Sequence, residues 1–381
     1  MIIIVFIFLI FEFYIKKLTL SINKKSIFFV LLYFITISLS IVTTIDPLAF
    51  FDIYKHIVFG LLFFFVSLMI LNNKNRIRWS IYILGLTILV NYFYQLIIYF
   101  FQNFLFTFQN FFYYKYWEVL RLNLNKQKFF VDVYDSALIP VIFILFYWFK
   151  NNLAYKFYKV LAILTALFFA AVSNFRTQLL MAISSLIGAV YVSSKNKRGF
   201  ISRLFGLMLI LIVLSSIFRS FIESSTIERI VEPSQAETQT ITTRFDWWKQ
   251  SIEMGISSPL VGIGLNNFYE YLSPKTKINN LSPGSQKKLA RITAAHPHSI
   301  FFQTIAETGV LGFISLMLLL IDFIKNDIYA FKRKNIPCNL IIVSFWSIFL
   351  FSIFNPPITL QYLISFWFLR ALTIKLTEFS L

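Results

Sequence analysis

Cysteine, histidine and acidic residues are all scarce in this 381-residue chain. The single cysteine, Cys338, excludes an intramolecular disulfide framework and any zinc site built on cysteine pairs. Charged residues make up only 14% of the chain and hydrophobic residues 58%. A water-soluble domain of this length could not bury that much apolar surface. The composition therefore excludes an ordinary soluble enzyme and indicates a membrane protein.

Apolar runs of the length of a bilayer crossing recur along the chain. A spanning helix needs roughly 17–25 mostly apolar residues, or slightly fewer with polar ends. The first run, Met1–Ile15, lacks a basic leading segment and a small-residue cleavage site, so we predict a retained helix rather than a signal peptide. The other runs are Ile27–Val42, Ile57–Leu71, Ile77–Phe101, Ala137–Phe149, Val160–Val172, Leu179–Val192, Leu204–Phe218, Ile300–Ile321, Leu340–Phe354 and Leu360–Leu372. They predict an all-α, polytopic membrane protein of about 11–12 transmembrane helices.

Basic residues outnumber acidic ones by 35 to 17, yet their distribution argues against nucleic acid as a partner. They gather in short loops between apolar runs, which is the positive-inside pattern of membrane proteins. The clusters are Lys16/Lys17/Lys24/Lys25, Lys74/Arg76/Arg78, Lys150/Lys156/Lys159, Lys195/Lys197/Arg198/Arg203 and Lys325/Lys332/Arg333/Lys334. If all five face the cytoplasm, the outer loops are Thr43–Tyr54, roughly Gln102–Ser136, Ser173–Thr177, Ile222–His298 and Asn355–Pro357. The C-terminus then lies inside and the N-terminus outside, unless Phe100–Tyr116 hides a further helix.

The longest outer segment, residues 222–298, is the one sizeable soluble region of the predicted topology. It separates an N-terminal transmembrane bundle (1–221) from C-terminal transmembrane helices (299–381). Between Thr242 and Met254 the apolar pattern predicts an amphipathic helix, capped by Thr242 or Thr243. Because Trp247 and Trp248 favour the headgroup level, we expect this helix to lie near the membrane interface.

Two arginines fall on the predicted outer face, Arg176 in "VSNFRTQ" and Arg244 in "TTRFDWW". The planar fork of arginine suits phosphate and pyrophosphate oxygens, so the two together suggest an anionic lipid headgroup. Taken alone, Arg176 fits a snorkelling helix anchor equally well. Taken alone, Arg244 fits a surface ion pair with Asp246 or Glu253 better.

Two of the three histidines stand in "HPHS", at His296 and His298. Pro297 suits a first helical position, so His298 is predicted in the first turn of a helix that enters the membrane from outside. The positive helix end and nearby arginines favour neutral imidazole, which is the form that a general base needs. Two histidines among Lys and Arg, without Asp or Cys, make a poor divalent site, so we predict no metal. An isolated histidine here would instead be a polar helix cap.

Other polar and glycine motifs carry weaker signals. "GIGLNNF" (Gly262–Phe268) lacks the third glycine of a dinucleotide fingerprint, and its glycines predict a tight turn. Gly309 allows close helix approach or a local break. Gln303 and Glu307 lie four apart on one helix face. Glu307 is predicted to orient His298, to line a pocket, or to make an interhelix hydrogen bond.

The sequence "TTRFDWWKQSIEMGISSPLVGIGLNNF", followed by "HPHSIFFQTIAETGVLG", resembles the O-antigen ligase and polymerase superfamily of bacterial envelope glycosyltransferases. The matching positions are Arg244, Trp247 or Trp248, Pro259-Leu260, Gly262, Gly264, Phe268, His298-Ser299, Gln303, Glu307, Gly309 and Gly312. "SNFRTQLL" is similar to an earlier arginine hairpin of the family and places Arg176. Ser299 departs from the asparagine of many members. The resemblance covers the C-terminal half, and the first 150 residues match only in character.

The resemblance implies a C-type glycosyltransferase-like fold with one large periplasmic loop in the bacterial inner membrane, and an active site that faces the periplasm. It implies glycan transfer from undecaprenyl pyrophosphate to an acceptor hydroxyl, without a metal ion or cofactor. Arg176 and Arg244 correspond to the pyrophosphate binders and His298 to the catalytic residue. The implied partners are the lipid-linked glycan donor, a lipid A–core or glycan acceptor, and membrane lipids. Candidate supporting residues are His296, Arg291, Gln303 and Glu307.

Three functions are compatible with this resemblance and with the residues. "HPHS" is closer to ligase-like members, which favours an O-antigen ligase. An O-antigen polymerase uses similar residues but a growing glycan as acceptor. A lipid-linked glycan transporter ranks lowest, because it needs charged residues deep within spans, whereas Glu12 and Arg370 lie near the ends of the predicted runs.

Overall fold

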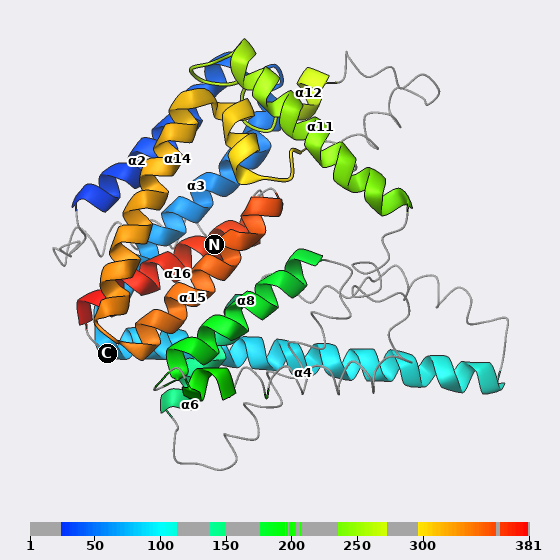
Figure 1. Cartoon of the computed structure of the whole chain (residues 1–381), viewed down its shortest axis with the longest axis vertical. Coiled ribbons are helices and arrows are strands. Elements are labelled where there is room, and N and C mark those ends of the chain that lie inside the picture. The colour runs from blue at the N-terminus through cyan, green and yellow to red at the C-terminus, as the bar shows by residue number, and fades with distance from the viewer. Residues whose placement is uncertain are drawn as a thin grey trace. The chain divides into compact units, whose positions relative to one another are not determined.

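The computed structural model describes residues 24–112, 137–148, 176–194, 196, 198–202, 206, 235–272, 296–355 and 359–379. All regular elements in these residues are helices, which confirms the predicted all-α class (Figure 1). They are α2 (Lys24–Leu39), the 3-10 helix η1 (Ser40–Thr43), α3 (Pro47–Ile70), α4 (Lys74–Phe112), α6 (Ile139–Trp148), α8 (Arg176–Ser193), α11 (Gln235–Ser257), α12 (Phe268–Leu272), α14 (Ile300–Lys332), α15 (Ile336–Phe354) and α16 (Leu360–Phe379).

Five helical stretches within the described ranges are long and apolar enough to cross a membrane, which fits the predicted polytopic architecture. They are Lys25–Thr43, Pro47–Ile70, Lys74–Tyr94, Ile300–Lys332 and Ile336–Phe354. The predicted runs Met1–Ile15 and Val160–Val172, and most of Leu204–Phe218, lie outside the described residues. The total of 11–12 spans therefore stays a prediction.

α4 corrects the predicted boundary of the second outer loop. We predicted a loop from about residue 102, but the helix continues to Phe112. Its 39 residues extend over about 58 Å, far beyond the roughly 30 Å of a hydrocarbon core. The first part of the Phe-rich stretch 100–116 thus prolongs α4 rather than forming a separate helix.

The chain folds into two compact units, which we describe separately. The first contains α2, η1, α3, α11, α12, α14 and α16, and the second contains α6, α8 and most of α4. α15 gives residues Asn339–Ile348 to the second unit and its two ends to the first. This division into two units reflects how the helices pack. The predicted division at residues 222 and 298 follows the sides of the membrane and stays a prediction.

In the first unit α14 packs against α2 and α11, and α16 packs against α3. Gly60 permits the close approach of α3 and α16, because a Cβ there would lie 3.0 Å from the side chains of Leu363 and Trp367. In the second unit α6 packs against α8. Such pairings through small residues are typical of membrane helices, where van der Waals contact rather than water exclusion drives association.

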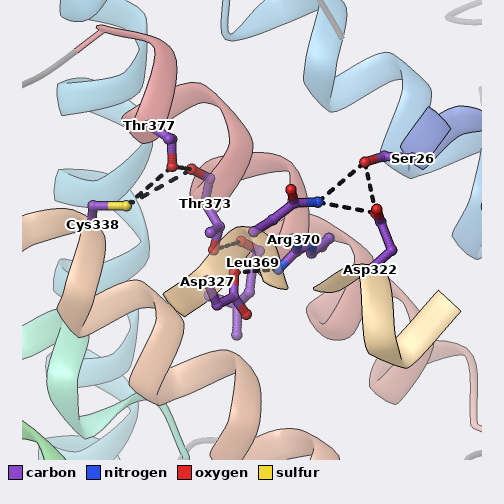
Figure 2. Close-up of polar contacts among 9 residues, drawn as sticks. Ser26, Asp322, Asp327, Cys338, Leu369, Arg370, Thr373 and Thr377 are labelled. Carbon is purple, nitrogen blue, oxygen red and sulfur yellow. Dashed lines mark hydrogen bonds and ion pairs between the residues drawn. The ribbon is translucent and has the colours of Figure 1, made fainter. Parts of the chain in front are cut away.

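Buried polar residues join α2, α14 and α16 within the first unit (Figure 2). Ser26 Oγ donates a hydrogen bond to Asp322 Oδ2 at 2.7 Å, and Arg370 pairs with Asp327 at 2.6 Å. The guanidinium of Arg370 also lies 4.0 Å from the ring centroid of Phe323. We placed Arg370 near the end of a span, but it is the eleventh of the 20 residues of α16 and is 1% exposed. The first unit therefore holds more buried charge than the sequence suggested.

Candidate functional site

The helix that we predicted between Thr242 and Met254 exists but begins earlier. α11 runs from Gln235 to Ser257, so Thr242 and Thr243 lie inside the helix and do not cap it. The sequence has no glycine or proline between residues 235 and 254, so nothing prevents the helix from beginning several residues before these threonines. The apolar pattern predicted only the C-terminal part of this helix.

α11 lies against the first turns of α14. Gly255 sits where a Cβ would be 2.7 Å from Ile305 Cγ2, so only glycine allows this approach without a shift. Their sequence neighbours at the same interface, Met254 and Ala306, belong to a buried cluster on which Trp247 packs. This packing brings the arginine–tryptophan motif of α11 to the beginning of α14.

His298 precedes α14 rather than lying in its first turn, so our placement of Pro297 at a first helical position is wrong. The helix begins at Ile300, and Ser299 is the extended residue before it, with φ −159°. His298 has φ +49°, in the left-handed region. Histidine is among the few non-glycine residues enriched there, and this conformation cannot continue into a right-handed helix.

Two tryptophans of α11 contact the segment that carries His298. The indole Nε1 of Trp248 donates a hydrogen bond to the Pro297 carbonyl oxygen at 2.7 Å. The Trp248 ring stacks on Phe302, with centroids 4.8 Å apart and planes at 10°. The Trp247 ring stacks on the His298 imidazole, with centroids 5.3 Å apart and planes at 21°. Sequence reasoning assigned both rings to the membrane interface and missed these contacts.

Both histidines are neutral at physiological pH, and burial is the main cause. Burial lowers the pKa of His298 to about 4, and the Arg244 charge adds to that lowering. Burial also lowers the pKa of His296 to about 4, with a further contribution from His298. We predicted neutral imidazole from the positive helix end and nearby arginines. The arginine contributes, but desolvation outweighs it.

The arginines that we singled out stand in different situations. Arg244 is half-buried on α11, one turn before Trp247 and Trp248, and close enough to influence His298. Arg176 is the first residue of α8, in the other unit. Arg291 lies outside the described residues. The structure thus brings Arg244, His296 and His298 together, and the joint action of Arg176 stays a prediction.

Gln303 and Glu307 are buried and bonded to each other. Gln303 Nε2 donates to Glu307 Oε2 at 3.0 Å, so the hydrogen bond lies within one helix rather than between two. Glu307 Oε1 and His298 Nδ1 are both buried, and neither has a hydrogen-bond partner in the described part of the chain. Glu307 therefore does not hold His298 through Nδ1. It does line a mainly apolar cavity of about 80 Å³ among α2, α3, α14 and α16.

α14 is interrupted at Gly309, where φ is +65° and ψ is −164°. In a continuous helix the N–H groups of Val310 and Leu311 would bond to the carbonyls of Ala306 and Glu307. Here a loop, residues 259–264, takes up all four groups. The bonds run from Val310 N to Pro259 O (2.8 Å), from Leu311 N to Leu260 O (3.2 Å), from Ile263 N to Ala306 O (2.9 Å) and from Gly264 N to Glu307 O (3.0 Å). The break thus leaves none of these four backbone groups without a partner.

Glycines make this insertion of the loop possible. Gly262 and Gly264 have φ of +69° and +96°, which confirms the tight turn that we predicted. A Cβ on Gly309 would lie 2.6 Å from Gly262 N and Leu260 O. The "PLVGIG" and "ETGVLG" motifs are therefore two halves of one backbone contact, which periodicity along the sequence could not reveal.

Asn267 is a supporting residue that our sequence reasoning missed. Its Oδ1 accepts hydrogen bonds from the backbone N–H groups of Ile45 and Asp46, at 3.1 and 2.6 Å. Its neighbour Asn266 donates from Nδ2 to the Ala49 carbonyl oxygen at 2.9 Å. The two asparagines tie the loop to the start of α3. The signal was present in the paired amides of "GIGLNNF", but amides of this kind are common in turns.

Residues 161–317 match the family model described as O-antigen ligase. No curated protein matches the chain. The matched segment contains Arg176, Arg244, both histidines and the loop 259–264. It supports a function of the O-antigen ligase or polymerase type for a multi-pass membrane protein. The match thus confirms, over residues 161–317, that the chain resembles the O-antigen ligase-like superfamily.

Proposed function

We propose that the protein is an O-antigen ligase, a glycosyltransferase of the bacterial inner membrane that acts on the periplasmic side. It transfers a glycan from undecaprenyl pyrophosphate to a hydroxyl group of lipid A–core. One observation carries the proposal: neutral His298 stacks on α11 close to Arg244, inside the segment that matches the O-antigen ligase family.

In this reaction His298 accepts the proton of the acceptor hydroxyl, and the oxygen attacks the anomeric carbon of the glycan. The bond between that carbon and the pyrophosphate oxygen breaks. Arg244 and Arg176 hold the pyrophosphate and stabilise the negative charge that it carries away. The two arginines take the role that a metal ion plays elsewhere, so the proposal includes no metal or cofactor. His296, Arg291, Gln303 and Glu307 support these groups.

The test is transfer by the purified full-length protein from a lipid-linked donor to lipid A–core, with a chelator present. His298→Asn is the most informative variant, because asparagine also tolerates a positive φ but offers no base. We expect transfer to fall by roughly 10²–10⁴-fold, as when a general base is removed. Ile252→Ala, at a 46% exposed position of α11, is the control. Full activity of His298→Asn would show that the catalytic assignment is wrong.

An O-antigen polymerase is the second candidate, because the family match supports it as well as it supports a ligase. A deletion strain separates the two. Long lipid-linked chains that accumulate without reaching lipid A–core support the ligase. Lipid A–core that carries single repeat units supports the polymerase.

A lipid-linked glycan transporter is the third candidate, and the buried Arg370–Asp327 pair is the observation in its favour. The pair is neutral overall and joins α14 to α16, so a purely structural role also accounts for it. Transport is excluded if His298→Asn abolishes transfer while the lipid-linked donor still reaches the periplasmic side.

A further inference from the structure

We infer that Trp247 and Trp248 are positioning residues that hold the His298 imidazole in a single orientation at the start of α14. The catalytic consequence of this inference rests on the proposed function of His298. The orientation of the ring does not depend on that function, and it can be measured separately.

Trp248 fixes the peptide plane that precedes His298. Its N–H donates to the carbonyl of that plane at 2.7 Å, and its ring is held against Phe302. A planar peptide turns as one body, so rotating this carbonyl also changes φ of His298. That φ is +49°, a value that a residue other than glycine keeps only when its surroundings impose it. The hydrogen bond from Trp248 is such a restraint.

Trp247 fixes the plane of the imidazole ring. The two rings are nearly parallel, at 21°. Trp247 is itself packed against the buried cluster that contains Met254, Ile263 and Ala306, so its own position depends on the loop that fills the break in α14. The two tryptophans are adjacent in the sequence and point about 100° apart around α11. One therefore reaches the backbone before His298 and the other reaches its side chain.

Stacking takes the place of the hydrogen bond that usually orients a functional histidine. Such a histidine normally donates or accepts at its second ring nitrogen. In the residues that the structure describes, Nδ1 of His298 is buried without a hydrogen-bond partner. The ring is thus oriented by its contact with Trp247 and by the backbone that Trp248 restrains.

Nuclear magnetic resonance of the histidine rings tests the structural part. The full-length protein in lipid nanodiscs, labelled only at histidine, gives signals from three rings, and His298→Asn identifies the one of interest. Trp248→Phe removes the N–H but keeps an aromatic ring for Phe302, and Trp247→Leu removes the stack. We expect both variants to move the His298 signals downfield and to raise its pKa from about 4 by at least one unit toward 6.5.

Trp247→Phe is the matched control, because it keeps an aromatic face and is expected to leave the His298 signals near their original positions. His56 on α3 reports on folding, since its signals move only if the protein unfolds more widely. If Trp247→Leu also moves the His56 signals, that variant is unfolded and the inference is judged on Trp248→Phe alone. Unchanged His298 signals in Trp248→Phe overturn the inference, whatever the activity.

Transfer kinetics test the catalytic consequence. We expect Trp248→Phe to lower kcat about tenfold or more while KM for the donor changes less than about twofold, because the base is misplaced and the donor site is intact. If the His298 signals move as expected but His298→Asn transfers normally, the proposed function fails and the positioning role stands. If they move and kcat of Trp248→Phe is unchanged, the catalytic part of the inference fails.

Discussion

The surroundings of His298 change the chemistry of its side chain. A histidine in water is half protonated near pH 6.5. Burial beside Arg244 lowers the pKa of His298 to about 4, so the ring remains an unprotonated base well into acidic solution. The same burial makes the ring a weaker base, which is useful only if the acceptor hydroxyl is held close to it.

Transfer activity should therefore remain nearly constant as the pH falls from 7.5 to 5.5. Protonation inactivates a general base, and a lowered pKa moves that loss to lower pH. With a pKa of about 4, almost all of the His298 population is neutral at pH 5.5. An unperturbed histidine would lose roughly tenfold of its active form over the same range. The measurement is kcat/KM against pH, and a half-maximal rate near pH 6.5 contradicts the assignment.

At the scale of elements, the interruption of α14 is the feature that organises the site. The loop 259–264 supplies the hydrogen bonds that Gly309 removes, so α11, the loop and the first turns of α14 are joined through main-chain groups. Irregular backbone at membrane depth is tolerated only when protein groups satisfy it. The orientation of His298 therefore depends on residues more than 30 positions earlier in the chain.

Gly309→Ala is expected to destabilise the protein by more than about 1–3 kcal/mol. Alanine does not readily adopt φ +65°, and its Cβ would meet the loop backbone at 2.6 Å. Gly206→Ala is the matched control, because among the described residues no atom outside its own helix backbone lies within 4 Å of a Cβ there, and alanine favours a helix. Thermal unfolding in detergent compares the two variants. Equal stability would mean that the break in α14 is not required.

The pair of Arg370 and Asp327 leads to a second prediction at this scale. Asp327→Asn leaves a buried guanidinium without its counter-charge, so we expect a loss of about 3–5 kcal/mol of unfolding free energy. The double variant Asp327→Leu/Arg370→Met removes both charges and should recover most of the loss. Asp52→Asn is the control, since the Asp52–Lys55 pair is exposed and contributes about 0–1 kcal/mol. A double variant as unstable as the single one would contradict this account.

At the scale of the whole molecule, apolar runs predicted the helical class and the approximate places of α2, α3, α14 and α15. They did not predict where a helix continues through polar residues. The predicted run ended at Ile321, whereas α14 extends to Lys332. Topology predicted only that Arg244 and His298 share the outer face, and their nearness follows from the packing of α11 on α14. The contact between residues 259–264 and α14 did not, because backbone pairing between distant segments leaves no periodic trace in either segment.

The predicted sidedness can be checked by labelling introduced cysteines. Leu48 is 81% exposed at the start of α3, beside the loop that Asn267 joins to it, and Lys334 is exposed after α14. The one native cysteine, Cys338, is buried. We expect a membrane-impermeant maleimide to label Leu48→Cys in intact spheroplasts and Lys334→Cys only after permeabilisation, because basic loops stay inside. The reverse pattern would invert the topology.

The interruption of α14 also bears on how the protein is made. Residues 259–264 leave the ribosome before residues 306–311 do, so the loop is already available for translocation when α14 reaches the bilayer. In the interrupted form of α14, these four main-chain groups find partners only once the loop is in place, and burying them unpaired in lipid is unfavourable. A defect in the loop would therefore be felt during biogenesis, as a helix that fails to settle in the membrane, before any substrate is met.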